Sequence, residues 1–95
     1  MKFAFYCVDK PGHTHVRAEN REAHLEYAKG VNDRMLCGGP LLSDDGEQMV
    51  GSLLVIDFDS LEAAQEWAKN DPYAKAGLFE SVRISPWKHV LPLQG

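Results

Sequence analysis

The stretch MLCGGPLLSDDGEQMVGSLLVIDF, residues 35–58, contains two apolar segments joined by a short polar loop. Residues 35–42 and 48–58 have the length and composition of β-strands, and the Ser-Asp-Asp-Gly-Glu segment between them, residues 43–47, is typical of a hairpin loop. The centre of the chain is therefore predicted to be an antiparallel β-hairpin.

The segment before this hairpin supplies one strand and one helix. Residues 2–8 (KFAFYCV) are rich in aromatic side chains and end at the turn signal Asp-Lys-Pro-Gly, which favours a strand. After a loop over residues 10–17, the stretch from 17 to 30 predicts a helix whose carboxyl end lies near Gly30.

The segment after the hairpin repeats the helix and the strand. Residues 61–69 predict a second helix, because Ser60 or Asp59 is able to cap its first turn. An Asn-Asp-Pro sequence must end this helix, since proline disfavours the helical conformation of the residue before it. A short helical turn over residues 73–78 and a last strand over residues 80–90 complete the prediction.

The resulting order β-α-β-β-α-β predicts an α+β fold of the ferredoxin-like type. In that topology the first and third strands are central, and the second and fourth lie at the edges. Pro40 and Pro86 fall in the two predicted edge strands. Since proline donates no ladder hydrogen bond, edge strands are where it is tolerated.

Both faces of the predicted sheet are apolar, although helices cover only one of them. The first and third strands place large apolar side chains on alternate sides: Phe3, Phe5 and Cys7 against Ala4, Tyr6 and Val8, and Leu53 and Val55 against Leu54 and Ile56. A monomer would expose a large apolar patch. We therefore expect a homodimer with two sheets packed face to face; the alternative is that the carboxy-terminal segment folds back over this face.

Composition limits the class of protein. The 95 residues predict one domain over residues 1–95, with 10 Lys and Arg against 14 Asp and Glu and a net charge of −4. This balance argues against a nucleic-acid partner, and no apolar run approaches the ~18 residues of a membrane-spanning helix. With no recognisable signal peptide, a cytoplasmic location is expected. Cys7 and Cys37 are too few for a disulfide framework and are expected to pack as small hydrophobes.

Two titratable residues share the predicted inward face of the first helix. At about 100° per residue, His24 and Arg21 fall on the same half of the helical wheel as Tyr27, Leu25 and Val31. His24 is either a core-edge histidine bound to a backbone carbonyl or a functional imidazole. The topology places the end of the second helix across the sheet from the first helix, so Asp71 is either a turn former before Pro72 or the carboxylate that orients an imidazole on this neighbouring helix.

Other candidate features leave alternatives open. Gly38-Gly39-Pro40 indicates either a bent edge strand or a floor for a ligand between the sheet and the first helix. His13-x-His15 has metal-ligand spacing but no third ligand nearby in sequence. Tyr6, Tyr73 and Trp67 are expected to pack rather than to form a stacking platform. No phosphate loop, nucleophile elbow or dinucleotide fingerprint is present.

An ordered set of short motifs resembles the YCII-related proteins: Arg21-x-x-His24-Leu25, Gly39-Pro40, Gly51, Ser60-Leu61-Glu62-Ala63-Ala64, Asp71-Pro72-Tyr73 with Ala76-Gly77, and Pro86-Trp87. The resemblance implies a dimeric α/β barrel formed by two ferredoxin-like sheets. It also implies that His24 and Asp71 are a suspected catalytic dyad, with Arg21, Gly39 and Pro40 near the same cleft. A few relatives of this fold act on small cyclic or aromatic compounds as dehydrochlorinase-like or isomerase-like enzymes.

The predicted function is general acid/base proton transfer on a small cyclic or aromatic acid, leading to elimination or isomerisation without a cofactor. His24 and Asp71 are the predicted catalytic residues, and Arg21, Gly39, Pro40 and Tyr73 the predicted substrate-binding residues. The main alternative is a module that binds a small ligand without catalysis. Two further alternatives are haem or metal binding through His13, His15 or His89, and a structural role with no pocket.

Overall fold

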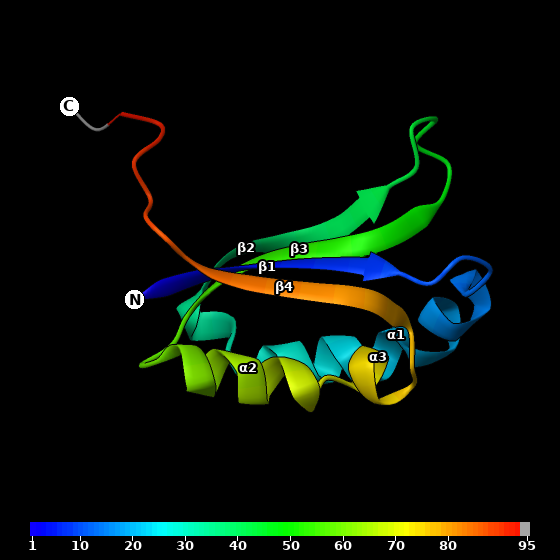
Figure 1. Ribbon diagram of the computed structural model, residues 1–95, viewed down its shortest axis with the longest axis horizontal. Helices are drawn as coiled ribbons and strands as arrows, with labels where there is room; N and C mark the ends of the chain where they lie inside the picture. The colour runs from blue at the N-terminus through cyan, green and yellow to red at the C-terminus, as the bar shows by residue number, and fades with distance from the viewer. Residues whose placement is uncertain (94–95) are drawn as a thin grey trace.

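The computed structural model describes residues 1–93. A four-stranded antiparallel sheet carries all the helices on one face and leaves the other face open (Figure 1). In chain order the elements are β1 Lys2–Asp9, α1 Thr14–Lys29, the 3-10 turn η1 Asn32–Arg34, β2 Met35–Leu42, β3 Met49–Asp57, α2 Leu61–Lys69, α3 Pro72–Lys75 and β4 Phe79–Trp87.

The strand order is β2-β3-β1-β4, so β1 and β3 are central as predicted. Pro40 and Pro86 lie in the two edge strands, which confirms the ferredoxin-like arrangement. The bounds of β2 and α2 match their predictions, and Ser60 is the cap of α2, since its Oγ accepts from the N–H of Ala63 at 3.1 Å.

Three element ends differ from the sequence prediction by three residues, and one of them is the end of α3, which is Lys75 and not residue 78. The first helix begins at Thr14, three residues before the predicted start. The reason is the tight turn at Pro11 and Gly12: a φ of +72° at Gly12 reverses the chain at once and leaves no long loop. The last strand ends at Trp87, three residues before the predicted end at residue 90.

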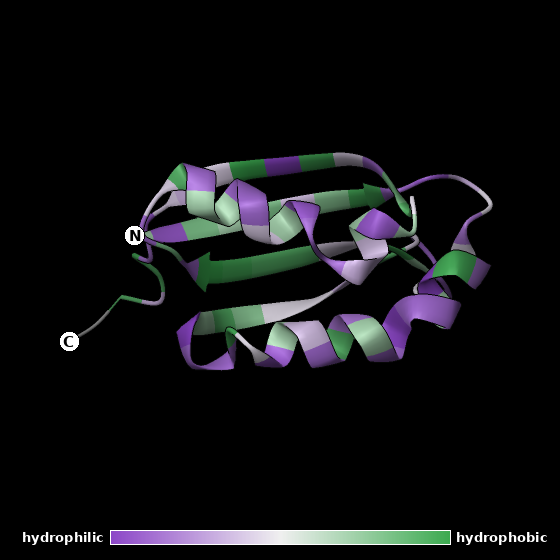
Figure 2. Cartoon of the chain, turned by 90° about the horizontal axis from the view of Figure 1, so that it is seen from below, coloured by the Kyte–Doolittle hydropathy of each residue, from purple (hydrophilic) through white to green (hydrophobic). Residues whose placement is uncertain are grey.

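The core lies between the sheet and the helices. Phe3, Phe5 and Ile56 of the central strands are almost fully buried. Trp67 of α2 meets Phe5 edge-on, with ring centres 5.7 Å apart. Figure 2 shows the apolar central strands behind helices of mixed polarity, as expected for helices that cover one face only. Burial of each large side chain stabilises the fold by roughly 1.5–3 kcal/mol.

The open face of the sheet exposes large apolar side chains. Tyr6 is 50% exposed and Leu53 41% exposed, so the prediction that Tyr6 packs is wrong for the isolated chain. The described part of the carboxy-terminal tail, residues 88–93, leaves the sheet after Trp87 and runs away from it (Figure 1). Among the described residues, the tail therefore does not fold back over this face.

Candidate active site

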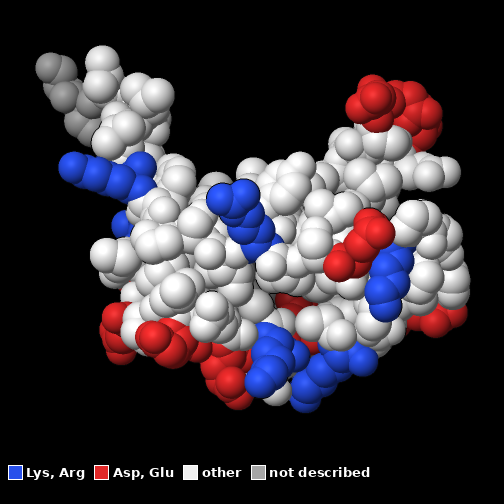
Figure 3. Space-filling model, in the orientation of Figure 1, with Lys and Arg blue, Asp and Glu red and all other residues white. Residues whose placement is uncertain are grey.

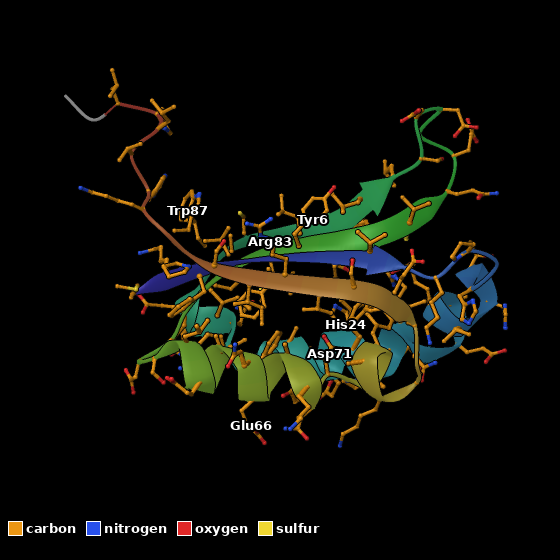
Figure 4. All side chains as sticks on the ribbon, in the orientation of Figure 1. Tyr6, His24, Glu66, Asp71, Arg83 and Trp87 are labelled. Atoms are coloured by element: carbon orange, nitrogen blue, oxygen red, sulfur yellow. The ribbon has the colours of Figure 1, made fainter. Side chains whose placement is uncertain are left out.

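His24 of α1 and Asp71 at the start of α3 lie against each other between the sheet and the helices (Figure 4). The Nδ1 atom of His24 is 3.0 Å from both carboxylate oxygens of Asp71. Both residues are buried, at 9% and 3% exposure. An ionised carboxylate only accepts hydrogen bonds, so Nδ1 of His24 is the donor of this pair and Nε2 is the ring nitrogen left for another partner. The two residues are 47 positions apart in sequence.

Local structure at the start of α3 fixes the direction of the carboxylate. Asp71 has extended backbone angles before Pro72, and its Oδ1 accepts from the N–H of Tyr73 at 2.8 Å, which caps the short helix. The ring of Tyr73 stacks on the imidazole of His24, with centres 4.1 Å apart and planes 15° from parallel. The imidazole is thus held by a carboxylate at one nitrogen and an aromatic ring at its face.

A second polar group adjoins this pair. The buried Arg17 of α1 donates from Nε and Nη2 to the two oxygens of Asp9, at 2.7 and 2.9 Å, and from Nη2 to Oγ of Ser52 at 2.9 Å. Burial by itself lowers the pKa of Arg17, but the hydrogen bonds and charge of Asp9 outweigh it and raise the pKa above its ordinary value. Arg17 therefore stays cationic inside the fold. Its guanidinium carbon lies 4.6 Å from the centre of the Tyr73 ring.

These groups border a cavity of about 160 Å³ between α1 and strands β2 and β3. A cavity of about 150 Å³ is known to hold one benzene molecule, so this space fits a single six-membered ring. Its polar lining is Arg17, Arg21, His24, Ser52 and Tyr73, and its other lining residues are Leu25, Ala28, Met35, Gly38, Gly39, Pro40, Met49 and Leu54. An apolar cavity with a few converging polar groups is the usual form of a small-ligand site.

All five predicted residues besides Asp71 line this cavity, namely Arg21, His24, Gly39, Pro40 and Tyr73. Asp71 lies behind His24 and borders a smaller space on the side of α2. Beside Gly39, Gly38 has a packing reason to be glycine, because a Cβ there would lie 2.6 Å from Cδ2 of Leu54. The Gly-Gly-Pro segment is therefore both part of an edge strand and a wall of the cavity.

The sequence did not predict Arg17, Asp9 or Ser52 as residues of the site. Arg17 stands four residues before Arg21 and seven before His24, so the helical wheel places it on the same face. Ser52 is a polar residue two positions before Leu54, on the inward face of a central strand. Both signals were present. Nothing in the sequence pairs Asp9 with Arg17, because the turn between them could direct Asp9 to solvent.

The remaining candidates lie apart from this cavity. The rings of His13 and His15 are 6.0 Å apart near the start of α1, and Nδ1 of His13 lies 2.8 Å from the backbone oxygen of Pro11. His89 stacks on Trp87 beyond the end of β4. Within residues 1–93, no three His, Cys, Asp or Glu side chains form a group able to hold a metal ion.

The two cysteines are free, as expected, but differ in environment. Cys7 is buried, and burial, with a further contribution from Asp71, raises its pKa from 9.0 to about 12. Cys37 is exposed on β2, so the prediction that it packs as a hydrophobe is wrong for the isolated chain. None of the helices in the described residues is long and apolar enough to cross a membrane.

The fold and the cavity define a class: a ferredoxin-like α+β protein with a buried His–Asp pair beside a ring-sized space. The chain belongs to the YCII-related family, because residues 1–88 match the model of the YCII-related domain. Protein YciI of Escherichia coli O6:H1 is 37% identical over 97 residues, which cover 95% of this chain and 99% of that protein.

Two further relatives have names that refer to chemistry. The "derivative of benzaldehyde biosynthesis cluster protein C" of Emericella nidulans is 39% identical over 77 residues, covering 73% of this chain and 78% of that protein. The solved structure of 5-chloro-2-hydroxyhydroquinone dehydrochlorinase (TftG) from Burkholderia phenoliruptrix AC1100, in complex with 2,5-dihydroxybenzoquinone, superposes with a TM-score of 0.87. It is 36% identical, and the match covers 94% of this chain and 95% of that one. An enzyme therefore exists on this fold with a small cyclic ligand.

Proposed function

We propose that the protein is an enzyme in which His24 transfers a proton to or from a small cyclic or aromatic acid, leading to elimination or isomerisation. The observation that carries the proposal is the position of His24: its Nδ1 atom faces both oxygens of the buried Asp71, and its ring lines a ring-sized cavity. The dehydrochlorinase activity named for TftG and the aromatic aldehyde named for the Emericella relative support this substrate class.

In this proposal His24 is the general base and Asp71 the residue that orients it. The carboxylate keeps the hydrogen on Nδ1, so that Nε2 accepts a proton from the substrate. The charge of Asp71 then stabilises the imidazolium that forms. The same imidazolium returns the proton to another atom in an isomerisation, or delivers it to solvent after a leaving group departs. A positioned base of this kind contributes typically 10²–10⁴-fold to a rate.

Removing a proton from a ring places negative charge on a substrate oxygen. Arg17 and Ser52 are donors in the cavity wall that are able to meet this charge. Asp9 already fixes the guanidinium of Arg17 through two hydrogen bonds, so the donors need little rearrangement. Arg21 is the proposed partner of a carboxylate or phenolate on the substrate, for which a planar guanidinium is suited.

We also propose that two copies pair through the open sheet face. The exposed Tyr6 and Leu53 support this, as does the tail, which leaves the face uncovered in the described residues. A second copy presents the same apolar surface, and a twofold axis makes that surface self-complementary.

Two assays test the proposal. The first follows by NMR the exchange of ring protons for deuterium in D₂O, with a panel of small phenols and cyclic acids as substrates. The second measures the release of chloride from 5-chloro-2-hydroxyhydroquinone. The wild type is expected to accelerate one of these reactions, and His24→Gln to lose on the order of 10²–10⁴ of the acceleration. Glu66→Gln, on the outer surface of α2, is the matched control and should retain it (Figure 4). Ligand binding without any turnover, or equal turnover by His24→Gln, would contradict the proposal.

A further inference from the structure

A wider groove, open to solvent, adjoins the ring-sized cavity on the side of the β2–β3 hairpin. Its volume is about 410 Å³, and we call it the outer chamber. Arg17, Arg21 and Met49 line both the groove and the ring-sized cavity, so the two spaces share a wall. The other lining residues of the outer chamber are Thr14, Ala18, Glu47 and Gln48. A substituent of a ring in the inner cavity therefore has room to extend past Arg21 into this chamber.

Two opposite charges face the outer chamber without neutralising each other. Arg21 and Glu47 are both exposed, and neither side chain takes part in an ion pair within 4.0 Å in residues 1–93. Arg17 differs, because its Nε and Nη2 groups already bind Asp9 and Ser52 and only Nη1 is left to bind a ligand. Glu47 belongs to the hairpin whose acidic end is the prominent red projection in Figure 3. The chamber thus offers one free guanidinium and one free carboxylate.

We infer that the outer chamber binds the ammonium and carboxylate of an α-amino-acid head group, while the ring of the same molecule occupies the inner cavity. This inference rests on the proposed function, and it narrows the substrate class from cyclic acids to ring-bearing amino acids. The guanidinium of Arg21 pairs with the carboxylate, and the carboxylate of Glu47 pairs with the ammonium. The amide of Gln48 and the hydroxyl of Thr14 supply neutral hydrogen bonds to either group.

Glu47 is the residue that is expected to make the outer chamber prefer an amino acid to a carboxylic acid without an ammonium group. A ligand with a carboxylate alone satisfies Arg21 but brings a like charge near Glu47, which disfavours it. A ligand with an ammonium alone pairs with Glu47 but brings a like charge near Arg21, which lowers its affinity. Because both side chains are exposed, solvent weakens each pair, and we expect each to change affinity by roughly fivefold.

The test compares three ligands that carry the same phenyl ring: phenylalanine, 3-phenylpropanoate and 2-phenylethylamine. Dissociation constants come from calorimetry, and the amide NMR shifts of Gly38 and Ser52 report entry of the ring into the inner cavity. Phenylalanine is expected to bind roughly fivefold more tightly than either partner ligand. Glu47→Gln should remove its advantage over 3-phenylpropanoate, and Arg21→Gln its advantage over 2-phenylethylamine. Asp44→Asn, in the same hairpin but outside the chamber lining, should leave both ratios unchanged.

The inference is overturned if phenylalanine does not bind, if 3-phenylpropanoate binds as tightly, or if Glu47→Gln leaves that ratio unchanged. Binding of 2,5-dihydroxybenzoquinone, the ligand of the TftG structure, separates this failure from failure of the proposed function. If the quinone shifts Gly38 and Ser52 while phenylalanine shows no advantage, the chamber assignment is wrong and the ring site remains. If phenylalanine shows its advantage while His24→Gln exchanges ring protons as fast as wild type, the chamber stands and the proposed chemistry is wrong.

Discussion

The carboxylate of Asp71 binds two neighbours at once, the imidazole of His24 and the backbone N–H of Tyr73. The second bond caps α3, so the side chain that orients the candidate base also begins a helix. A substitution here has both a structural and a chemical consequence. The asparagine variant separates them, because its amide oxygen still accepts the capping bond while its charge is gone.

Asp71→Asn is expected to keep the fold and to lose most of the rate of the proposed proton transfer. Without the carboxylate, nothing holds the hydrogen on Nδ1 of His24, so the rate should fall on the order of 10²–10⁴-fold. Asp71→Ala should in addition lose about 1 kcal/mol of unfolding free energy with the cap. Nitrogen-15 NMR of the imidazole shows which ring nitrogen is protonated, and urea denaturation gives the stability. An asparagine variant with the native tautomer and the full rate would contradict the role given to Asp71.

The reactivity of the Cys7 thiol shows whether solvent reaches the core next to His24 and Asp71. Its pKa of about 12, raised by burial from 9.0, keeps it a neutral thiol in the folded protein. Its contribution to stability is fully present below pH 9.0 and is lost as the pH rises from there towards about 12. In Cys37→Ser, iodoacetamide at pH 8 should therefore leave the native chain unlabelled and label it fully in guanidinium, as measured by mass. Rapid labelling of the native chain would show that this region opens to water.

Among individual residues, the sequence predicted those whose position follows from helix periodicity or from the order of the elements. His24 was identified from its place on the helix face predicted to point inward, and Asp71 from the topology that places the end of α2 across the sheet from α1. Arg17 was missed because a long cationic side chain near a helix start usually reaches solvent. Its burial depends on Asp9 and Ser52, which come from two different strands, and such a three-way contact has no sequence signature.

Among the elements, β2 shapes the cavity because two of its lining residues, Gly38 and Gly39, have no side chains. At Gly38 a side chain would enter the space that Leu54 occupies, whereas at Gly39 an added Cβ would meet no atom within 4 Å. The two adjacent glycines therefore respond differently to the same substitution. A side chain at position 38 requires Leu54 to move, whereas a side chain at position 39 requires no movement.

Gly38→Ala is expected to destabilise the fold by about 1–3 kcal/mol, because Leu54 or β2 must shift to make room. The same shift should weaken binding of a ring in the inner cavity. Gly39→Ala is the matched control and should change stability by less than about 1 kcal/mol, with a slight gain from the stiffer unfolded chain. Urea denaturation of both variants measures the difference. Equal effects at the two positions would show that close packing against Leu54 is not what excludes a side chain.

Element boundaries were predictable where a local signal fixes them. β2 and α2 match because Ser60 caps the helix and the polar hairpin loop ends the strand. The start of α1 was placed too late, since His13 precedes the helix without a side-chain capping bond and gives no signal. Register irregularities in β2, next to Met35 and Leu41, also depend on pairing with β3 and are invisible in the sequence.

For the whole molecule, alternation in the central strands predicted two apolar sheet faces, and the structure has them. The helix-covered face is closed by α1 and α2, but Tyr6 and Leu53 stay half-exposed on the other face. The alternation of side chains along the strands predicts that the open face is buried, but it does not predict what buries it. A carboxy-terminal tail and a second chain bury apolar surface equally well. The course of residues 88–93 away from the sheet favours the second chain.

Leu53→Lys is expected to convert the proposed dimer to a monomer, since it places a charge at the centre of the paired faces without a partner. Val82→Lys is the matched control: Val82 is equally exposed at 41%, but it pairs with Cys7 on the helix-covered side of the sheet. Light scattering after size exclusion should give wild type and Val82→Lys twice the chain mass of 10.6 kDa, and Leu53→Lys that mass once. A wild type that is monomeric at every concentration would mean that the open face pairs with something other than its own copy. The His24 site lies on the opposite side of the sheet, so a folded Leu53→Lys monomer should still bind 2,5-dihydroxybenzoquinone if one chain alone forms the ring cavity.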